Sequence, residues 1–221
     1  MLRAIAFDFD GVLAESVDVK TRAYAFLFEE EGEDVVQQVV DFHLKNGGVS
    51  RFEKFKFYYN DILHRPLSEK RFQELCARFS RLVVDEVVAA PWVDGAKEFL
   101  TRNEKQFTFA IISGTPEDEL KEIVRRRKMD HFFSSVRGSP KDKVVLLGEV
   151  MDEYHLKPEE MVFIGDAETD WRAARETKVP FLWRCAPGEA DLLPGYIGPR
   201  LSSLSELESN LSKSTFPHYR S

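Results

Sequence analysis

Residues 4–13 read AIAFDFDGVL, an apolar run that ends in two aspartates one residue apart and then a glycine. A run this short and apolar is typical of a strand buried on both faces, as in a parallel sheet. Side chains at positions i and i+2 of a strand share a face, so Asp8 and Asp10 are expected to project together where the strand ends. Two carboxylates that close repel each other unless a cation or a shared proton relieves them. The stretch therefore indicates a metal or catalytic site, and a polar turn with one capping aspartate is the simpler alternative.

Downstream of this strand the chain divides into an all-helical stretch and an alternating one. Apolar periodicity predicts four helices in the first stretch, over residues 15–31, 34–44, 51–59 and 68–88. Serines at 50 and 68 are placed to cap the third and fourth of these helices. The alternating stretch is predicted to hold helices over 96–102, 117–127, 141–154, 168–176 and 204–211, and strands over 107–112, 133–136, 161–164 and 180–183. Residues 113–116 are predicted to form a turn into helix 117–127.

Alternation of buried strands with helices predicts an α/β fold with a doubly wound parallel sheet and right-handed crossovers. Four consecutive helices do not fit a single crossover, so they are expected to form an inserted all-helical cap domain. We predict a catalytic core of residues 1–15 and 91–221 and a cap of residues 16–90. The two connections between them, 13–16 and 90–94, are expected to lie side by side and to act as a hinge pair.

The amino-acid composition limits which kinds of molecule the protein is expected to bind. The 221 residues are 43% hydrophobic and 31% charged, as in an ordinary globular protein, with a formal net charge of −7. The acidic balance argues against nucleic acid as a partner, and no apolar run approaches the span of a bilayer. Two cysteines far apart favour a reducing, cytoplasmic compartment. We expect a cytoplasmic monomer or homodimer that acts on a small molecule.

Polar residues follow the predicted strands at the edge where ligands of such sheets bind. They are Asp8 and Asp10 after the first strand, Ser113, Gly114 and Thr115 after the second, Lys141 and Lys143 after the third, and Asp166 and Asp170 after the fourth. Carboxylate oxygens suit Mg²⁺, and helix N–H groups, a hydroxyl and an ammonium suit a phosphate. The set indicates phosphoryl transfer, although each residue other than the first aspartate pair has an ordinary structural explanation when taken alone.

Four short motifs in this order resemble those of the haloacid dehalogenase superfamily of phosphatases, over essentially the full length of the chain. They are DFDGVL at 8–13, IISGT at 111–115, a lysine within GSPKDK at 138–143, and GDAETD at 165–170. Each motif is weak alone, and their order after successive predicted strands makes the resemblance specific. It implies a Rossmann-like core, an alpha-helical cap between the first two motifs, and Mg²⁺ as cofactor.

The resemblance also assigns roles to the matched positions. Asp8 is the nucleophile that forms an aspartyl-phosphate, Asp10 the general acid and base, Ser113, Gly114 and Thr115 the phosphate-binding group, and Lys143 the cation that neutralises charge. Mg²⁺ is bound by the carboxylates of Asp8 and Asp166 and the backbone carbonyl of Asp10, while Asp170 orients a bound water or the lysine. Relatives with a Gly-Ser-Pro start favour Lys143 over Lys141, which remains the alternative.

Two basic residues of the cap are candidates for substrate binding. Residues 47–51, GGVSR, resemble the specificity segment of beta-phosphoglucomutase-like members, in which the arginine can hold a second phosphate. Arg51 is therefore one candidate, and a solvated first-turn residue is the alternative. Lys20 stands where those mutases carry a histidine, and it either meets an anionic substrate group or is solvated. On the third predicted helix Arg51, Lys54 and Tyr58 share one face.

The function expected from these motifs is Mg²⁺-dependent hydrolysis of a small phosphate monoester through an aspartyl-phosphate. Relatives that cleave carbon–halogen bonds or phosphonates lack the second aspartate of the first motif, so Asp10 favours an oxygen ester. A sugar-phosphate mutase is the first alternative, and the histidine missing at Lys20 speaks against it. A phosphate-binding or scaffolding protein without turnover is the second, and the complete set of motif residues disfavours it.

Overall fold

The computed structural model describes residues 1–186 and 193–212. Six parallel strands form one sheet in the order β3-β2-β1-β4-β5-β6. They are β1 (Ala4–Phe7), β2 (Thr108–Pro116), β3 (Ser135–Ser139), β4 (Met161–Gly165), β5 (Phe181–Arg184) and β6 (Arg200–Leu201). The order reverses between β1 and β4, which is the switch point where ligands of doubly wound sheets bind. The predicted α/β class is confirmed.

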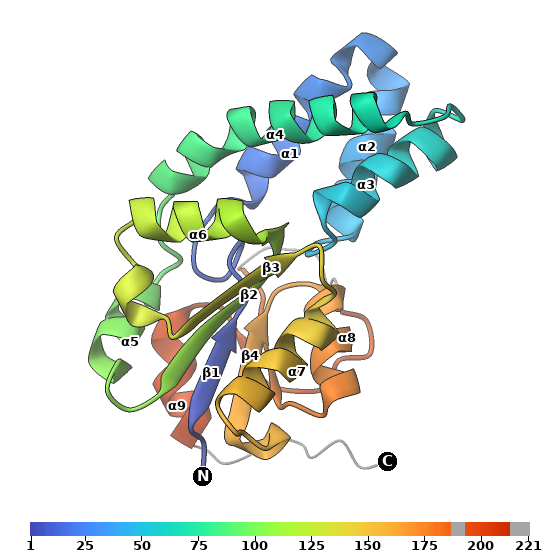
Figure 1. Cartoon of the computed structure of the whole chain (residues 1–221). Coiled ribbons are helices and arrows are strands. Elements are labelled where there is room, and N and C mark those ends of the chain that lie inside the picture. The colour runs from blue at the N-terminus through green and yellow to red at the C-terminus, as the bar shows by residue number, and fades with distance from the viewer. Residues whose placement is uncertain (187–192, 213–221) are drawn as a thin grey trace.

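Helices cover both faces of this sheet (Figure 1). One face packs against α5 (Ala96–Asn103), α6 (Glu117–Arg126) and α9 (Leu207–Ser212), and the other against α7 (Lys143–Glu153) and α8 (Glu168–Thr177). Alternation along β1 supplies both layers, because Ile5 and Phe7 enter the first core and Ala4 and Ala6 the second. Burial on both faces is the reason that the strand is apolar at every position.

The cap consists of the helices between β1 and α5, and it lies over the carboxyl ends of the strands (Figure 1). They are α1 (Val17–Leu27), α2 (Glu33–Lys45), α3 (Arg51–Phe57) and α4 (Glu69–Ala89). The predicted caps are confirmed, since Ser50 Oγ accepts a hydrogen bond from Glu53 N and Ser68 Oγ accepts one from Arg71 N. The aromatic residues that follow Arg51 form much of the cap interior, where Phe55 and Tyr58 are fully buried. The domain boundaries at 15/16 and 90/91 stay a prediction.

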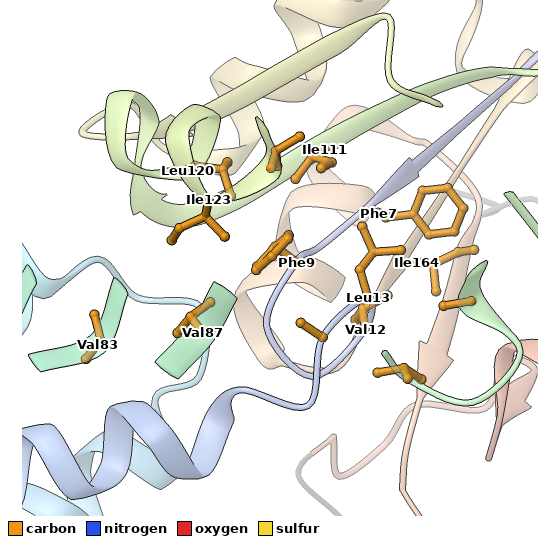
Figure 2. Packing of buried hydrophobic residues seen from close by; sticks show 14 of the residues in the cluster. Phe7, Phe9, Val12, Leu13, Val83, Val87, Ile111, Leu120, Ile123 and Ile164 are labelled. Atoms are coloured by element: carbon orange, nitrogen blue, oxygen red, sulfur yellow. The ribbon is translucent and has the colours of Figure 1, made fainter. Parts of the chain in front are cut away.

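Apolar packing joins the cap to the core near the connections. Val83 and Val87 of α4 belong to the same buried cluster as Leu120 and Ile123 of α6 (Figure 2). Burial of these four side chains holds α4 against α6. The cap therefore packs directly against α6 of the core.

The two connections lie side by side, as predicted. Ala14 forms an antiparallel bridge with Trp92, Val93 N donates to Leu13 O at 3.1 Å, and Glu15 N donates to Pro91 O at 2.9 Å. Their use as a hinge stays a prediction.

Several helix and strand boundaries in the structure differ from those predicted from the local sequence. The turn predicted at 113–116 is wrong, because β2 continues to Pro116 and pairs with β3 through a register shift after Ser113. Ladder hydrogen bonds to Gly138 and Ser139 outweigh the local preference of Gly, Thr and Pro for a turn. β6 was not predicted. The predicted helix 51–59 ends at Phe57 and passes into a π-helical turn, Tyr58–Ile62.

The remaining short helices are 3-10 turns at Glu29–Glu31, Asp130–Phe132, Pro158–Glu160 and Leu204–Glu206. Across the described residues, none of the helices combines the length and apolarity needed to span a bilayer.

Candidate active site

Three carboxylates converge at the switch point between β1 and β4. Asp8 follows β1, Asp166 follows β4, and Asp170 lies in the first turn of α8. One oxygen from each lies within 4.8 Å of the other two. The turn after β1 fits closely against this group, since Gly11 has φ +76° and a Cβ there would lie 2.2 Å from Asp166 Oδ2. Glycine at position 11 therefore avoids the clash that a Cβ would make with the Asp166 carboxylate.

Lys143 is the cation of this cluster. It opens α7, it is 4% exposed, and its Nζ lies 2.6 Å from Asp170 Oδ1 and 3.1 Å from Asp8 Oδ1. The other oxygen of Asp170 accepts a hydrogen bond from Ala167 N at 3.1 Å. Asp170 therefore uses both oxygens within the protein and holds the lysine against Asp8. Lys141 instead pairs with Glu149 at the surface, so the geometry favours Lys143.

Burial and mutual repulsion make it unfavourable for all three carboxylates of the cluster to be ionised at once. Burial raises the pKa of Asp8 to about 7, with Lys143 opposing and Asp170 and Asp10 adding to the rise. Burial and the neighbouring Asp8 and Asp170 also raise the pKa of Asp166 well above its usual range. Burial disfavours the ammonium of Lys143 too, but Asp170 and Asp8 outweigh it and raise its pKa. One lysine among three carboxylates leaves an excess of negative charge that a divalent cation would neutralise.

Asp10 lies in different surroundings. β1 ends at Phe7, so both aspartates lie in the turn beyond the strand, and their carboxylates reach different partners. Asp10 pairs with Lys20 and accepts hydrogen bonds from Ser16 Oγ at 2.6 Å and Thr115 Oγ1 at 3.2 Å. Burial disfavours its charge, but Lys20 and these hydrogen bonds outweigh burial and lower the pKa of Asp10. The two aspartates therefore differ in protonation behaviour.

Ser113, Gly114 and Thr115 line the same cavity from the end of β2. They lie at the end of the strand, and Thr115 directly precedes Pro116, the N-cap residue of α6. The Thr115 N–H donates to Ser113 Oγ at 3.2 Å. Gly114 lies against Gly48 of the cap. A phosphate bound here would meet the Ser113 hydroxyl at the end of a strand that runs directly into α6, and its binding by the N–H groups of Gly114 and Thr115 stays a prediction.

The cap closes the cavity from above. Gly47 O accepts a hydrogen bond from Thr169 Oγ1 at 3.0 Å. Gly48 has φ +73°, and a Cβ on it would lie 2.1 Å from the same hydroxyl. The cavity measures about 310 Å³, at the low end of the roughly 300–1,000 Å³ of ligand pockets. That volume suits a small metabolite.

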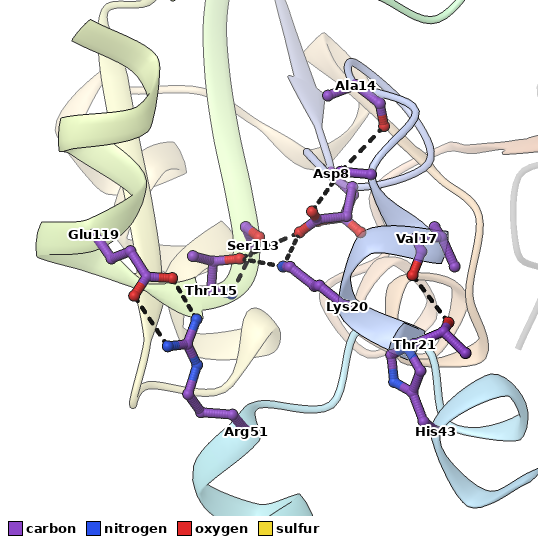
Figure 3. A network of polar contacts seen from close by, with 12 residues as sticks. Asp8, Ala14, Val17, Lys20, Thr21, His43, Arg51, Ser113, Thr115 and Glu119 are labelled. Atoms are coloured by element: carbon purple, nitrogen blue, oxygen red, sulfur yellow. Dashed lines mark hydrogen bonds and ion pairs between the residues drawn. The ribbon is translucent and has the colours of Figure 1, made fainter. Parts of the chain in front are cut away.

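The cap residues Arg51 and Lys20 both line this cavity. Arg51 is 4% exposed and forms a two-pronged ion pair with Glu119 of α6, with Nη1 to Oε2 at 2.9 Å (Figure 3). Lys20 pairs with Asp10 and donates to Thr115 Oγ1 at 2.8 Å. The solvated alternative is therefore wrong for both residues. Their binding of substrate stays a prediction.

Sequence reasoning missed part of the cavity wall. Tyr24, His43 and Lys54 line it from the cap. Ser16 holds Asp10, and Thr169 holds the cap loop. The one usable signal was the spacing of Lys54, which is one turn after Arg51 on the same helix face.

Comparisons with known proteins find a matching family and solved structures with the same fold. The family model described as haloacid dehalogenase-like hydrolase matches residues 5–184. No curated protein sequence matches the chain significantly. Solved structures with the same fold include a beta-phosphoglucomutase from Clostridium difficile, with TM-score 0.77, 15% identity, and coverage of 99% of each chain.

Two further structures resemble the chain closely in fold. A predicted phosphatase from Clostridium acetobutylicum has TM-score 0.75 and 18% identity, covering 96% of this chain and 99% of its own. A haloacid dehalogenase hydrolase from Bacillus subtilis, bound to magnesium, has TM-score 0.69 and 18% identity, with the same coverage. The family model spans most of the chain, and residues from three of the four motifs line one cavity while Lys143 of the third motif pairs with Asp8 beside it. The chain therefore belongs to the haloacid dehalogenase-like hydrolases and is an enzyme of that family.

Proposed function

We propose that this chain is a Mg²⁺-dependent phosphatase that hydrolyses a small phosphate monoester through an aspartyl-phosphate. The observation that carries the proposal is the placement of buried Asp8 between Lys143 and Asp166, with Asp10 and Ser113 on the same cavity. Asp8 would attack phosphorus, and the bond between phosphorus and the alkoxide oxygen would break. Lys143, fixed by Asp170, would hold its positive charge beside the nucleophile throughout.

Asp10 would serve as the general acid for the leaving alkoxide and then as the base for a water that attacks phosphorus. That attack would break the bond between phosphorus and the Asp8 oxygen, release phosphate and restore the Asp8 carboxylate. The pKa of Asp10 is lowered in the free protein, so Asp10 stands ready to accept a proton from the hydrolytic water. Donation to the leaving alkoxide requires that Asp10 first take up a proton. A phosphate dianion beside it would favour this uptake, since a nearby like charge raises a carboxyl pKa.

The excess of carboxylates fits Mg²⁺. The residues that would hold it are Asp8 and Asp166 through their carboxylates and Asp10 through its carbonyl, while Asp170 acts through Lys143. When bound, Mg²⁺ would offset the repulsion between the nucleophile and the anionic phosphate.

The proposal is tested by phosphate release from p-nitrophenyl phosphate, with Mg²⁺ and with excess EDTA. We expect turnover with Mg²⁺ and its loss with EDTA. Asp8→Asn is expected to lower kcat/KM by at least about 10³-fold, because the nucleophile is lost. The variant should still fold, which circular dichroism would check. Absence of release from this substrate and from a panel of phosphorylated metabolites would contradict the proposal.

A sugar-phosphate mutase is the second candidate. The fold of the Clostridium difficile beta-phosphoglucomutase and the position of Arg51 on the cavity wall favour it. Incubation with glucose 1-phosphate separates the two, because a mutase would yield glucose 6-phosphate and a phosphatase would yield free phosphate.

A further inference from the structure

Three basic side chains line the described wall of the cavity besides the neutral ring of His43, and two of them already have carboxylate partners. Lys20 pairs with Asp10, and Arg51 pairs with Glu119. The third is Lys54, which lies one turn after Arg51 on α3. Within the described part of the chain, no carboxylate oxygen lies within 4.0 Å of Lys54 Nζ. Lys54 is therefore the cation of the cavity that lacks an anionic partner.

Lys54 is almost fully buried beside two aromatic rings. The residue is 2% exposed, and its Nζ lies 5.6 Å from the centre of the Tyr24 ring. Its contacts with His43 are 2.7 Å to Nδ1 and 3.4 Å to the backbone oxygen. Burial, followed by the positive charge of Lys20, lowers the pKa of Lys54 to about 7. A buried ammonium in this position is costly unless something anionic joins it.

His43 positions Lys54 without neutralising it. Burial and the adjacent Lys54 lower the pKa of His43 to about 2, so the imidazole is neutral. A neutral Nδ1 can accept one hydrogen bond from an ammonium, which carries three donors. The two contacts to His43 therefore leave the protonated form of Lys54 with a further donor and a charge that no carboxylate within 4.0 Å compensates, among the described residues.

We propose that Lys54, positioned by His43, binds an anionic substituent on the leaving group of the substrate. The substrate class is then a phosphate monoester that carries a second anionic group, either a carboxylate or a second phosphate. This inference rests on the proposed phosphatase function and extends it. Asp8, Ser113 and Lys54 line a single cavity of about 310 Å³, so one small molecule would meet both the core and the cap.

The alternative is a purely structural lysine, and it makes a different prediction. A side chain needed only to fill space beside Tyr24 and His43 gains nothing from a charge, and methionine of similar volume would serve as well. An ion-binding lysine instead changes the discrimination between anionic and neutral leaving groups.

The experiment compares matched substrates on wild type and Lys54→Met. The pairs are 2-phosphoglycolate with ethyl phosphate, 3-phosphoglycerate with glycerol 3-phosphate, and fructose 1,6-bisphosphate with fructose 6-phosphate. In at least one pair we expect wild type to prefer the member with the second anion, and Lys54→Met to lower kcat/KM for that member by about 10- to 100-fold, mainly through KM, as for a lost charge-assisted hydrogen bond. The loss on p-nitrophenyl phosphate, whose leaving group carries no second anion, is expected to be smaller than the loss on that member.

Lys56→Met is the matched control, because Lys56 lies on the same helix, pairs with Glu53 at the surface and does not line the cavity. It should behave as wild type. Thermal melting checks folding, and Lys54→Gln replaces the methionine variant if that variant does not fold.

Each other outcome overturns a definite claim. Three results would overturn the proposed role of Lys54 and leave the proposed phosphatase function standing. They are a preference that survives in Lys54→Met, no preference in wild type, and an equal loss on all substrates. No hydrolysis of any substrate by wild type, p-nitrophenyl phosphate included, would overturn the proposed function and this inference with it.

Discussion

Lys143 shows how one side chain sets the charge beside Asp8. It is 4% exposed between Asp8 and Asp170, and Asp170 is itself fully buried with both oxygens occupied. A buried ammonium with two carboxylate partners keeps its charge, because loss of the proton would leave two anions unpaired. Lys143 therefore presents a fixed positive charge to whatever Asp8 attacks.

The two candidate lysines of the third motif can be told apart by substitution. Lys143→Met is expected to lower kcat/KM by at least about 10²-fold, since it removes the charge that neutralises the nucleophile and the phosphoryl group. Lys141→Met should stay within about twofold, because its partner Glu149 lies at the surface. Steady-state kinetics on p-nitrophenyl phosphate would show the difference. Equal losses in the two variants would mean that the assignment is wrong.

At the scale of a single element, α3 explains how the cap supplies two cations to the cavity wall. Ser50 caps the helix, so the chain turns from the glycine loop directly into a helical turn. Arg51 and Lys54 then fall on one face, three residues apart. Phe55 and Tyr58 hold the helix in the cap interior. Burial of the aromatic residues thus fixes the direction in which both cations point.

The buried position of Lys54 predicts a pH dependence of stability. Its pKa is about 7 in the folded protein, against about 10.4 in an unfolded chain. Between these values the unfolded chain binds more protons, so this residue makes stability rise with pH, and its cost is fully present below about pH 7. The free energy of unfolding of wild type, minus that of Lys54→Met, should rise with pH by at most about 1.4 kcal/mol per unit across this window.

Urea melts at about pH 6.5, 8 and 9.5 measure this difference. The groups that act on Lys54 are Lys20, Asp10, Lys143 and Asp166, and the groups packed against it are Tyr24 and the ring of His43, which is neutral throughout. Lys56→Met serves again as control, with no such slope. A difference that stays flat with pH would show that Lys54 titrates normally.

For the whole molecule, the position of the cap depends on contacts that cross from one domain to the other. Glu119 of α6 binds Arg51 of α3, and it also accepts a hydrogen bond from Ser80 of α4 at 2.6 Å. Arg127 of the core donates to the carbonyl oxygens of Val87, Val88 and Ala90 at the end of α4. The second set lies beside the connections, whereas Glu119 acts at the cavity.

Removal of the Glu119 charge should therefore loosen the cap. Glu119→Gln leaves a buried guanidinium without its anion, a change that costs about 3–5 kcal/mol when the site stays closed. We expect the cap to open more often to hydrate Arg51, so amide hydrogen exchange over residues 46–57 should be at least about tenfold faster.

Glu122→Gln is the control, because Glu122 lies on the same helix and pairs only with Arg125 at the surface, among the described contacts. Hydrogen exchange with mass spectrometry reads both variants. Unchanged exchange over the cap in Glu119→Gln would show that this ion pair does not hold the cap closed.

Sequence by itself determined the fold class and most members of the site. The buried run before Asp8 and the alternation after residue 96 required a parallel sheet, and the rule that ligands bind at the carboxyl ends of strands then gathered Asp8, Asp166 and Lys143 from distant positions. These inferences succeeded because the side-chain period of a strand or helix is a local property of the sequence. The edge at which parallel strands end follows in turn from the topology of the sheet.

Only the tertiary structure decided which partner each charged side chain has. Asp8 and Asp10 are two residues apart, yet one lies among carboxylates with a raised pKa and the other against Lys20 with a lowered one. Arg51 faces Glu119, and Lys54 faces no carboxylate among the described residues. The energy of a charge depends on burial and on neighbours brought from elsewhere in the chain, and a linear sequence contains neither quantity.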